Sequence, residues 1–252
     1  FGKVVLILCL AALLAAYDGD IDLRRLGILL AVPGGLMLLI MLQPDLGMVL
    51  VYVAIVFGML LVGGVQARHL VGLMVVGVIG VVVVLNSPVL ADYQKARLTA
   101  FADPNSDIQG ISYNVNQSQT AIASGGVTGQ GYGQGSLSRL EYVPERETDF
   151  IFTVLGEELG FVGCSALLLM YGALCWRIWR VAQLSRDRSG QLICVGVLCF
   201  LVFQVFENAG MTMQIMPVTG IPLPLVSYGG SSILTTFLAL GLVQNIHMHR
   251  FR

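Results

Sequence analysis

Long apolar stretches alternate with short polar segments along most of the chain, and one longer polar region interrupts them. Seven of the apolar stretches are candidate membrane-spanning helices. They are Val4–Tyr17, Leu26–Leu42, Leu46–Val62, Leu70–Leu85, Ile151–Trp179, Leu192–Met213 and Ile233–His247. Several approach the ~20 apolar residues that an α-helix needs to cross the hydrocarbon core of a bilayer. The pattern therefore predicts an all-α, polytopic membrane protein with about seven transmembrane helices.

The region between residues 88 and 148 is too polar to cross a bilayer, so we expect one large loop outside the membrane. Apolar residues recur at helical spacing in Val89–Phe101, which predicts an amphipathic helix at the membrane surface. A second helix is expected over Asn114–Ser124. The glycines from Gly125 to Gly135 follow no strand and precede no Lys-Ser/Thr pair, which favours a flexible hinge over a phosphate-binding loop.

Composition and charge agree with a membrane protein and predict its orientation. The mean hydropathy is +0.81, and the net charge of −1 offers no basic surface for nucleic acid. If the spans alternate, the arginines of the short loops fall on one side, which the positive-inside rule makes cytoplasmic. They are Arg24, Arg25, Arg68, Arg177, Arg180, Arg186, Arg188, Arg250 and Arg252. The C-terminus is then cytoplasmic, and the loops at 43–45, 88–148 and 216–230 share the opposite face, where we expect the site.

The start of the chain also bears on its organisation. The first apolar stretch is short and begins directly after Phe1 and Lys3, so we interpret residues 1–252 as a single membrane domain that lacks its N-terminal part. The five cysteines lie in apolar stretches without a CxxC pair, and the three histidines have no companion ligands. The sequence therefore predicts neither a disulfide framework nor a metal site.

Asp149 is the candidate for acid–base chemistry. It follows a cluster of charged residues and precedes Phe150-Ile151-Phe152 at the start of a predicted span. Burial among these apolar side chains would raise the pKa of its carboxyl group toward the range useful to a general base. A carboxylate near a helix N-terminus is also favoured by the helix dipole, so a structural role for Asp149 stays open.

Three further charged residues are candidates for substrate binding. Lys3 lies in an apolar helix, where a buried cation needs a partner, although its side chain could instead extend to a lipid headgroup. Asp45 is a candidate partner for Lys3 but could equally cap the helix that follows it. Arg97 in the large loop has the fork of donors that binds a diphosphate, and its alternative role is a solvated surface charge.

A series of motifs runs along almost the whole chain. They are Gln43-Pro44-Asp45-Leu46-Gly47, Tyr93-Gln94 with Arg97, Gln117-Ser118, Ser124-Gly125-Gly126, Thr148-Asp149-Phe150-Ile151-Phe152, Glu157-Glu158-Leu159-Gly160, and Pro217-Val218-Thr219-Gly220-Ile221-Pro222. Together they resemble the SEDS family of shape, elongation, division and sporulation proteins, which includes RodA, FtsW and SpoVE. The residues of the first motif slightly favour RodA.

The resemblance implies a ten-helix fold in the bacterial cytoplasmic membrane, of which this chain would hold the C-terminal seven helices. It implies an inverting peptidoglycan glycosyltransferase that polymerises lipid II at the outer face, releases undecaprenyl pyrophosphate and acts in cell elongation or division. Asp149 corresponds to the catalytic carboxylate. The residues expected to bind the substrate or to order its cavity are Lys3, Asp45, Arg97, Gln117, Ser118 and Glu145.

The resemblance also implies partners. The usual companion of the family is a class B penicillin-binding protein, and membrane lipids surround the helices. A divalent cation, Mg²⁺ or Mn²⁺, would suit the diphosphate, but no acidic cluster in the sequence requires one. Two other functions stay open on the residues alone. A flippase for the same lipid precursor would also use intramembrane charge, and a scaffold for the penicillin-binding protein would leave Asp149 dispensable.

Overall fold

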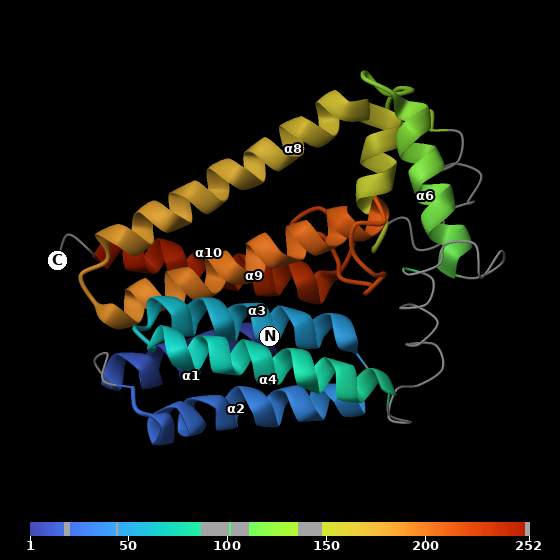
Figure 1. The fold of residues 1–252 in the computed structure, drawn as a ribbon. Helices are drawn as coiled ribbons and strands as arrows, with labels where there is room; N and C mark the ends of the chain where they lie inside the picture. The colour runs from blue at the N-terminus through green and yellow to red at the C-terminus, as the bar shows by residue number, and fades with distance from the viewer. Residues whose placement is uncertain (18–20, 44, 87–100, 102–110, 136–147, 250–252) are drawn as a thin grey trace. The chain divides into compact units, whose positions relative to one another are not determined.

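The structure is a computed structural model that describes residues 1–17, 21–43, 45–86, 101, 111–135 and 148–249. In this part of the chain the regular elements are all α-helices (Figure 1). They are α1 (Gly2–Ala16), α2 (Leu23–Leu42), α3 (Leu46–Val62), α4 (Ala67–Asn86), α6 (Ile111–Gly125), α8 (Ile151–Leu184), α9 (Arg188–Thr212) and α10 (Gly230–His249). The predicted all-α fold class is therefore confirmed.

Each of the seven predicted spans coincides with one helix, and α6 coincides with the helix predicted over Asn114–Ser124. Among the described residues, α2, α8 and α9 are long and apolar enough to cross a bilayer. The helices α1 and α3 and residues 67–80 of α4 are apolar but shorter. The chain is a multi-pass membrane protein, while its number of spans stays a prediction. The helix predicted over Val89–Phe101 lies outside the described residues, apart from Phe101.

The helices are grouped into two compact units, and both units combine stretches that are distant in sequence. Unit 1 comprises Phe1–Ala91, Cys175–Phe203 and Leu234–Arg252, and unit 2 comprises Asp92–Leu174 and Gln204–Ile233. The boundaries fall within α8 and α9, so each of these two helices contributes one part to each unit. Unit 2 contains the predicted large loop and the residues around Asp149.

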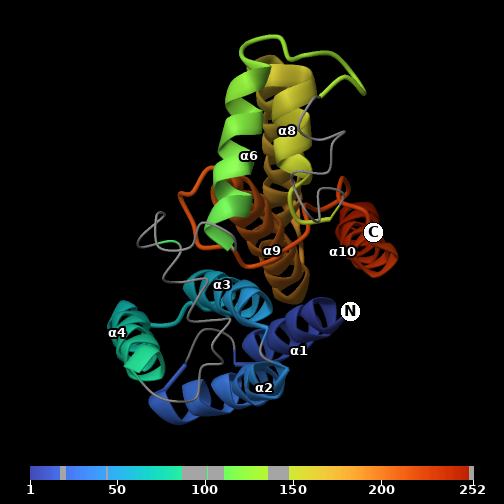
Figure 2. The same cartoon turned by 90° about the vertical axis from the view of Figure 1, so that its right-hand side faces the viewer.

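The core of unit 1 is built from α1, α3 and the first part of α9. Leu6 and Ile7 of α1 and Ile55 and Met59 of α3 are fully buried. Apolar side chains on these helices thus pack against one another. Because each helix is mostly apolar on every side, its sequence alone does not mark the buried face. Figures 1 and 2 show α1 and α3 on the side of α9, with α2 and α4 on the outside of the unit.

Small residues let the core helices of unit 1 approach closely. A Cβ atom at Gly58 in α3 would lie 2.2 Å from the Sγ atom of Cys199 in α9. A Cβ atom at Gly196 in α9 would lie 2.8 Å from Ile7 of α1. Membrane helices commonly associate through such small residues, because van der Waals packing rather than the hydrophobic effect holds helices together within lipid.

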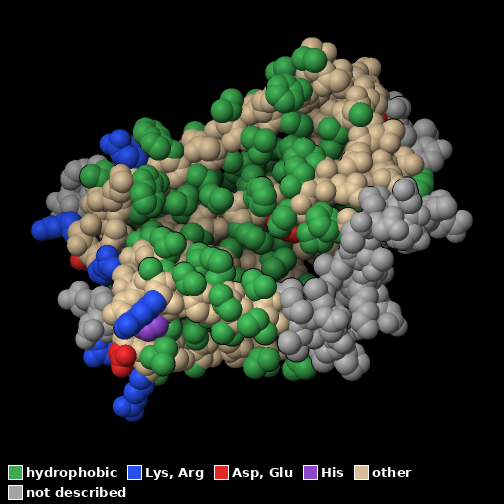
Figure 3. Space-filling model, viewed as in Figure 1, with side chains coloured by type: hydrophobic (Ala, Val, Ile, Leu, Met, Phe, Trp, Pro, Cys, Tyr) green, Lys and Arg blue, Asp and Glu red, His purple; other side chains and the backbone are tan. Residues whose placement is uncertain are grey.

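The outward faces of α2 and α4 are apolar, whereas the arginines of unit 1 gather at one end. Leu42 of α2 is 80% exposed and Val76 of α4 is 66% exposed, as expected for side chains in contact with lipid. Figure 3 shows hydrophobic side chains over the helices and Lys and Arg side chains at the end where α2 and α9 begin. There Arg188 donates to the Val62 carbonyl over 3.1 Å, and Arg25 lies over the Tyr17 ring.

In unit 2, α8 is broken near its start. Gly160 has φ 64° and ψ −162°, which removes it from the helical conformation. In an unbroken helix the N–H groups of Phe161 and Val162 would donate to carbonyls four residues earlier. Here the N–H of Phe161 donates to the carbonyl of Gly126 over 2.9 Å, and that of Val162 donates to the carbonyl of Val127 over 3.1 Å. The residues after α6 therefore satisfy the donors that the break leaves free.

The carbonyls on the other side of the break are satisfied by the same loop. The carbonyls of Glu157 and Glu158 would otherwise lack the N–H donors that an unbroken α8 would supply. The N–H of Gln130 donates to the Glu157 carbonyl and the N–H of Gly131 donates to the Glu158 carbonyl, each over 3.0 Å. Four backbone hydrogen bonds thus join α8 to residues 126–135, which we call the glycine loop.

Close approach to α8 requires glycine at Gly125, the last residue of α6, and at Gly129 of the glycine loop. A Cβ atom at Gly125 would lie 2.0 Å from the carbonyl oxygen of Gly156, and one at Gly129 would lie 2.1 Å from that of Glu158. Gly126, Gly129, Gly131 and Gly133 also have positive φ, a conformation that glycine adopts most readily. The flexible hinge predicted from these glycines is wrong, because the loop forms four backbone bonds with α8.

Candidate active site

Asp149 lies at the entrance to α8, two residues before Ile151, and its side chain is partly exposed. Its two neighbours in the Phe-Ile-Phe motif are buried, since Phe150 is 4% exposed and Phe152 is 3% exposed. The apolar motif thus anchors the chain immediately after Asp149 and leaves the carboxylate at the edge of the buried residues.

Asn208 holds the main chain at Asp149. This residue lies in the part of α9 that belongs to unit 2 and is fully buried. Its Nδ2 group donates one hydrogen bond to the carbonyl of Asp149 over 2.7 Å and another to the carbonyl of Ile221 over 2.8 Å. One amide therefore joins α9, the entrance to α8, and the loop of residues 213–229, which we call the α9–α10 loop.

Ser227 holds the adjacent peptide from the α9–α10 loop. Its hydroxyl group is 1% exposed, donates to the carbonyl of Thr148 and accepts the N–H of Leu223 over 2.7 Å. The same loop is tied to α8 through Tyr171, whose hydroxyl group donates to the carbonyl of Pro224. The carbonyls of Thr148 and Asp149 thus each accept a hydrogen bond from a buried side chain.

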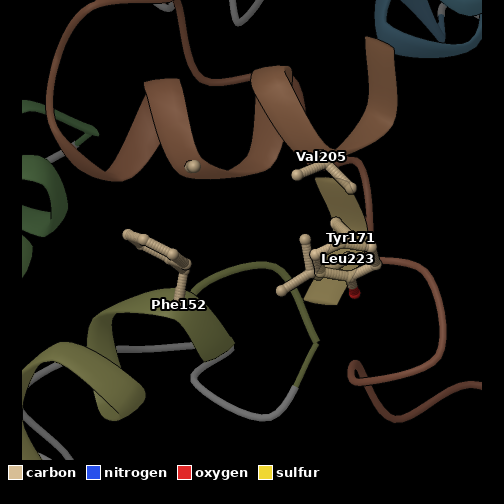
Figure 4. Close-up of a cluster of buried hydrophobic side chains, with 5 residues drawn as sticks. Phe152, Tyr171, Val205 and Leu223 are labelled. Carbon is tan, nitrogen blue, oxygen red and sulfur yellow. The ribbon is translucent and has the colours of Figure 1, made fainter. Parts of the chain in front are cut away.

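An apolar cluster supports these contacts. Phe152 and Tyr171 of α8, Val205 and Ala209 of α9, and Leu223 of the α9–α10 loop are buried together. Figure 4 shows that Tyr171 lies against Leu223, with Val205 on the neighbouring helix. Ala209 directly follows Asn208 in the sequence. The apolar packing and the hydrogen bonds of Asn208 therefore fix the same region of unit 2.

Ser118, which the resemblance assigned to the substrate cavity, lies inside unit 2. It is fully buried, forms a hydrogen bond with the hydroxyl group of Thr153 in α8, and donates to the carbonyl of Thr212 in α9 over 3.1 Å. Its neighbour Gln117 is half-buried on α6. Ser118 thus connects α6, α8 and α9, which fits the ordering of a cavity rather than direct contact with a substrate.

Glu207 adds a buried carboxylate next to Asn208. Its Oε1 atom accepts a hydrogen bond from the hydroxyl group of Thr219 over 3.0 Å. Its Oε2 atom is buried without a hydrogen-bond partner among the described residues. Consecutive residues of α9, Glu207 and Asn208, therefore both bind the α9–α10 loop.

Lys3 is a buried cation of unit 1, as the sequence suggested. Lys3 is 8% exposed, and its Nζ atom lies 5.7 Å from the centre of the Phe200 ring in α9. Asp45 is the candidate partner that the sequence names for this cation. Asp45 also caps α3, since its Oδ1 atom accepts the N–H of Met48 over 2.9 Å. Of the two alternatives for Asp45, the helix cap is thus confirmed, and the pairing with Lys3 stays a prediction.

The other predicted site residues, Arg97 and Glu145, lie outside the described residues. Within the described part of the chain, no three His, Cys, Asp or Glu side chains gather into a group that could hold a metal ion. The arrangement around Asp149 offers a carboxylate on a fixed main chain, which suits proton transfer from a bound substrate.

Sequence reasoning missed Asn208 and Ser227. The signal at Asn208 was an amide within an apolar helix, a position where a buried polar group is costly unless it is hydrogen-bonded. Ser227 belongs to a Ser-Tyr-Gly-Gly-Ser segment that also matches the SEDS motifs, but we assigned it no role of its own. Neither pattern identifies the partner, because Asn208 and Asp149 are 59 residues apart in sequence.

Comparison with known proteins assigns the chain to a family. A sequence profile for cell cycle proteins, named after FtsW, RodA and SpoVE, matches residues 1–252. The chain belongs to the FtsW/RodA/SpoVE family. This assignment confirms the resemblance that the motifs indicated.

Two members of the FtsW/RodA/SpoVE family illustrate the similarity in sequence. MrdB of Escherichia coli (strain K12), a peptidoglycan glycosyltransferase, is 41% identical over 230 residues, which cover 91% of this chain and 62% of MrdB. Stage V sporulation protein E of Bacillus subtilis (strain 168) is 38% identical over 249 residues, which cover 98% of this chain and 67% of that protein. The chain thus spans less than two thirds of MrdB. Because MrdB and stage V sporulation protein E both match, the inclination to RodA stays a prediction.

A solved structure supports the family fold. One chain of a peptidoglycan synthase complex that coordinates polymerization and crosslinking matches this structure with a TM-score of 0.79 at 36% identity. The match covers 99% of this chain and 69% of that chain. The helical fold described above is therefore that of the FtsW/RodA/SpoVE family.

Proposed function

We propose that this chain acts in a peptidoglycan glycosyltransferase that polymerises lipid II into glycan strands at the outer face of the bacterial cytoplasmic membrane. The observation that carries this proposal is its 41% identity to a peptidoglycan glycosyltransferase over 91% of the chain. The site agrees with the proposal, because the main chain at Asp149, just before α8, is held by hydrogen bonds from two buried side chains.

In the proposed reaction Asp149 is the general base. The acceptor sugar hydroxyl attacks the anomeric carbon of the donor, the bond from that carbon to the diphosphate breaks, and Asp149 takes the hydroxyl proton. The bonding electron pair goes to the diphosphate oxygen, and the diphosphate leaves while still attached to its undecaprenyl carrier. Attack from the side opposite the diphosphate inverts the anomeric carbon, so a single carboxylate suffices.

Cations are needed to offset the negative charge on the leaving diphosphate. We assign this role to Lys3 and Arg97, as the family resemblance implies, with Asp45 as the candidate partner of Lys3. Gln117, Ser118 and Glu145 complete the proposed cavity, with Ser118 acting through the helices that it joins. A divalent cation at the diphosphate stays a prediction.

The partners and location follow from the same proposal. A class B penicillin-binding protein would crosslink the strands that this protein makes, and a structural relative of this chain does belong to a peptidoglycan synthase complex. The arginines at one end of unit 1 favour a cytoplasmic position for that end and for the C-terminus.

The test is lipid II polymerisation by the full-length protein with its partner, comparing wild type with Asp149→Asn. We expect glycan chains from the wild type and a loss of at least about 100-fold in the variant, because the amide cannot accept the proton. Thermal unfolding and membrane insertion of both proteins must match. A folded Asp149→Asn protein that polymerises at the wild-type rate would refute the base and favour a flippase or a scaffold.

A further inference from the structure

We propose that Asn208 and Ser227 are positioning residues that fix the main chain of Thr148 and Asp149, so that the Asp149 carboxylate meets the acceptor hydroxyl in one geometry. The inference rests on the proposed role of Asp149 as the base. It assigns a function to two buried residues, 0% and 1% exposed, that would not themselves touch the substrate.

The contacts of Asn208 are suited to this role. Both of its hydrogen bonds are donated by Nδ2, and both acceptors are backbone carbonyls, those of Asp149 and Ile221. Its Oδ1 atom is buried without a hydrogen-bond partner in the described part of the chain. Because Asn208 binds the Asp149 carbonyl, it fixes the backbone at Asp149 without using the carboxylate oxygens that would take the proton.

Ser227 provides a second, independent attachment. It donates to the carbonyl of Thr148, one residue before Asp149, and its oxygen accepts the N–H of Leu223. Successive carbonyls are therefore held by two elements, α9 and the α9–α10 loop. Rotation of the Thr148–Asp149 peptide would break at least one of these bonds, and a fixed peptide restricts where the following side chain can lie.

The α9–α10 loop is itself held in one conformation. Leu225 has φ 67°, a backbone conformation that residues other than glycine rarely adopt. Such a conformation persists only where the surrounding contacts hold it. Those contacts include the bond from Tyr171 to Pro224 and the bond from Thr219 to Glu207. Ser227 and Ile221 therefore belong to a constrained loop, which allows them to define the position of Asp149.

The chain offers a matched control in Gln204. It lies one turn before Asn208 on α9, carries the same type of amide group and is 1% exposed. Its Nε2 atom has no hydrogen-bond partner among the described residues. Replacing Gln204 by leucine therefore removes a buried amide without releasing a carbonyl, whereas the same change at Asn208 releases two.

The experiment measures lipid II polymerisation by the full-length protein with its partner for Asn208→Leu, Ser227→Ala, Gln204→Leu and Asp149→Asn. We expect kcat to fall about 100-fold in Asn208→Leu and roughly 10-fold in Ser227→Ala, because small displacements of a catalytic group are costly. The KM for lipid II should stay within about twofold of the wild type in both variants. Gln204→Leu should keep the wild-type kcat.

The pH dependence of kcat separates positioning from a general loss of stability. The acidic limb of the profile reports the titration of the base in the enzyme–substrate complex. It should move in Asn208→Leu and Ser227→Ala, whose Asp149 has a changed environment, and should not move in Gln204→Leu. If Asn208→Leu does not fold, Ser227→Ala decides the question, since it removes only one hydroxyl group.

The outcomes distinguish the inference from the proposed function. If Asp149→Asn is inactive while folded Asn208→Leu and Ser227→Ala keep the wild-type kcat and pH profile, the positioning role is refuted and the proposed function stands. A raised KM at constant kcat would assign the two residues to substrate binding and would also refute positioning. If Asp149→Asn polymerises normally, the proposed function itself fails.

Discussion

The glycine loop allows a sharp test of how the break in α8 is held. Gly129 has φ 80° and Gly133 has φ 67°, so alanine at either position meets a similar backbone penalty of roughly 1–2 kcal/mol. The two positions differ in their surroundings. A Cβ atom at Gly129 would lie 2.1 Å from the carbonyl oxygen of Glu158, whereas one at Gly133 would have no heavy atom within 4 Å.

The clash at Gly129 would join a Cβ atom, whose position the backbone fixes, and a backbone carbonyl of α8, so no side-chain rotation can relieve it. The loop must move away from α8, which would break the adjacent bonds from Gln130 and Gly131 to the carbonyls of Glu157 and Glu158. Each bond contributes about 0.5–1.5 kcal/mol. Gly129→Ala should therefore lower the free energy of unfolding by roughly 1–3 kcal/mol more than Gly133→Ala.

The assay is thermal unfolding of both variants in the same detergent, with hydrogen exchange measured on a peptide that contains Phe161 and Val162. A difference of this size should lower the midpoint of Gly129→Ala by a further 2–4 °C or so per kcal/mol. The amides of Phe161 and Val162 should exchange faster only in Gly129→Ala. Equal midpoints and equal exchange in the two variants would refute the view that the loop replaces the bonds of the broken helix.

Two further predictions concern unit 1. Gly58→Ala should destabilise the protein by about 1–3 kcal/mol, since its Cβ would lie 2.2 Å from the Cys199 Sγ atom, and Cys199→Ala should restore stability. Gly77→Ala on α4, with no atom within 4 Å, is the control and should be neutral or slightly stabilising in thermal unfolding. Lys3→Met should reduce polymerisation about 100-fold without lowering the unfolding temperature, because it removes the buried charge to which we assign the leaving diphosphate. Wild-type polymerisation by Lys3→Met would exclude that role.

Much of the fold could be predicted from local patterns. Apolar stretches such as Leu46–Val62 coincide with helices because the length and hydropathy of a segment are properties of its own residues. Turn residues marked most helix ends for the same reason. The helix over Asn114–Ser124 was predicted in the same way and appears as α6. The helix cap at Asp45 was also foreseen, as one of two alternatives for that residue.

Only the tertiary structure decided which groups, distant in sequence, are hydrogen-bond partners. The sequence by itself determined that α8 and α9 exist, but not that Gly160 interrupts α8 or that the glycine loop supplies the missing bonds. A glycine permits a break or a flexible hinge equally, and the choice depends on backbone groups more than twenty residues away. The attachment of Asp149 to Asn208 is of the same kind, because a buried amide must be hydrogen-bonded but its own sequence does not say to what.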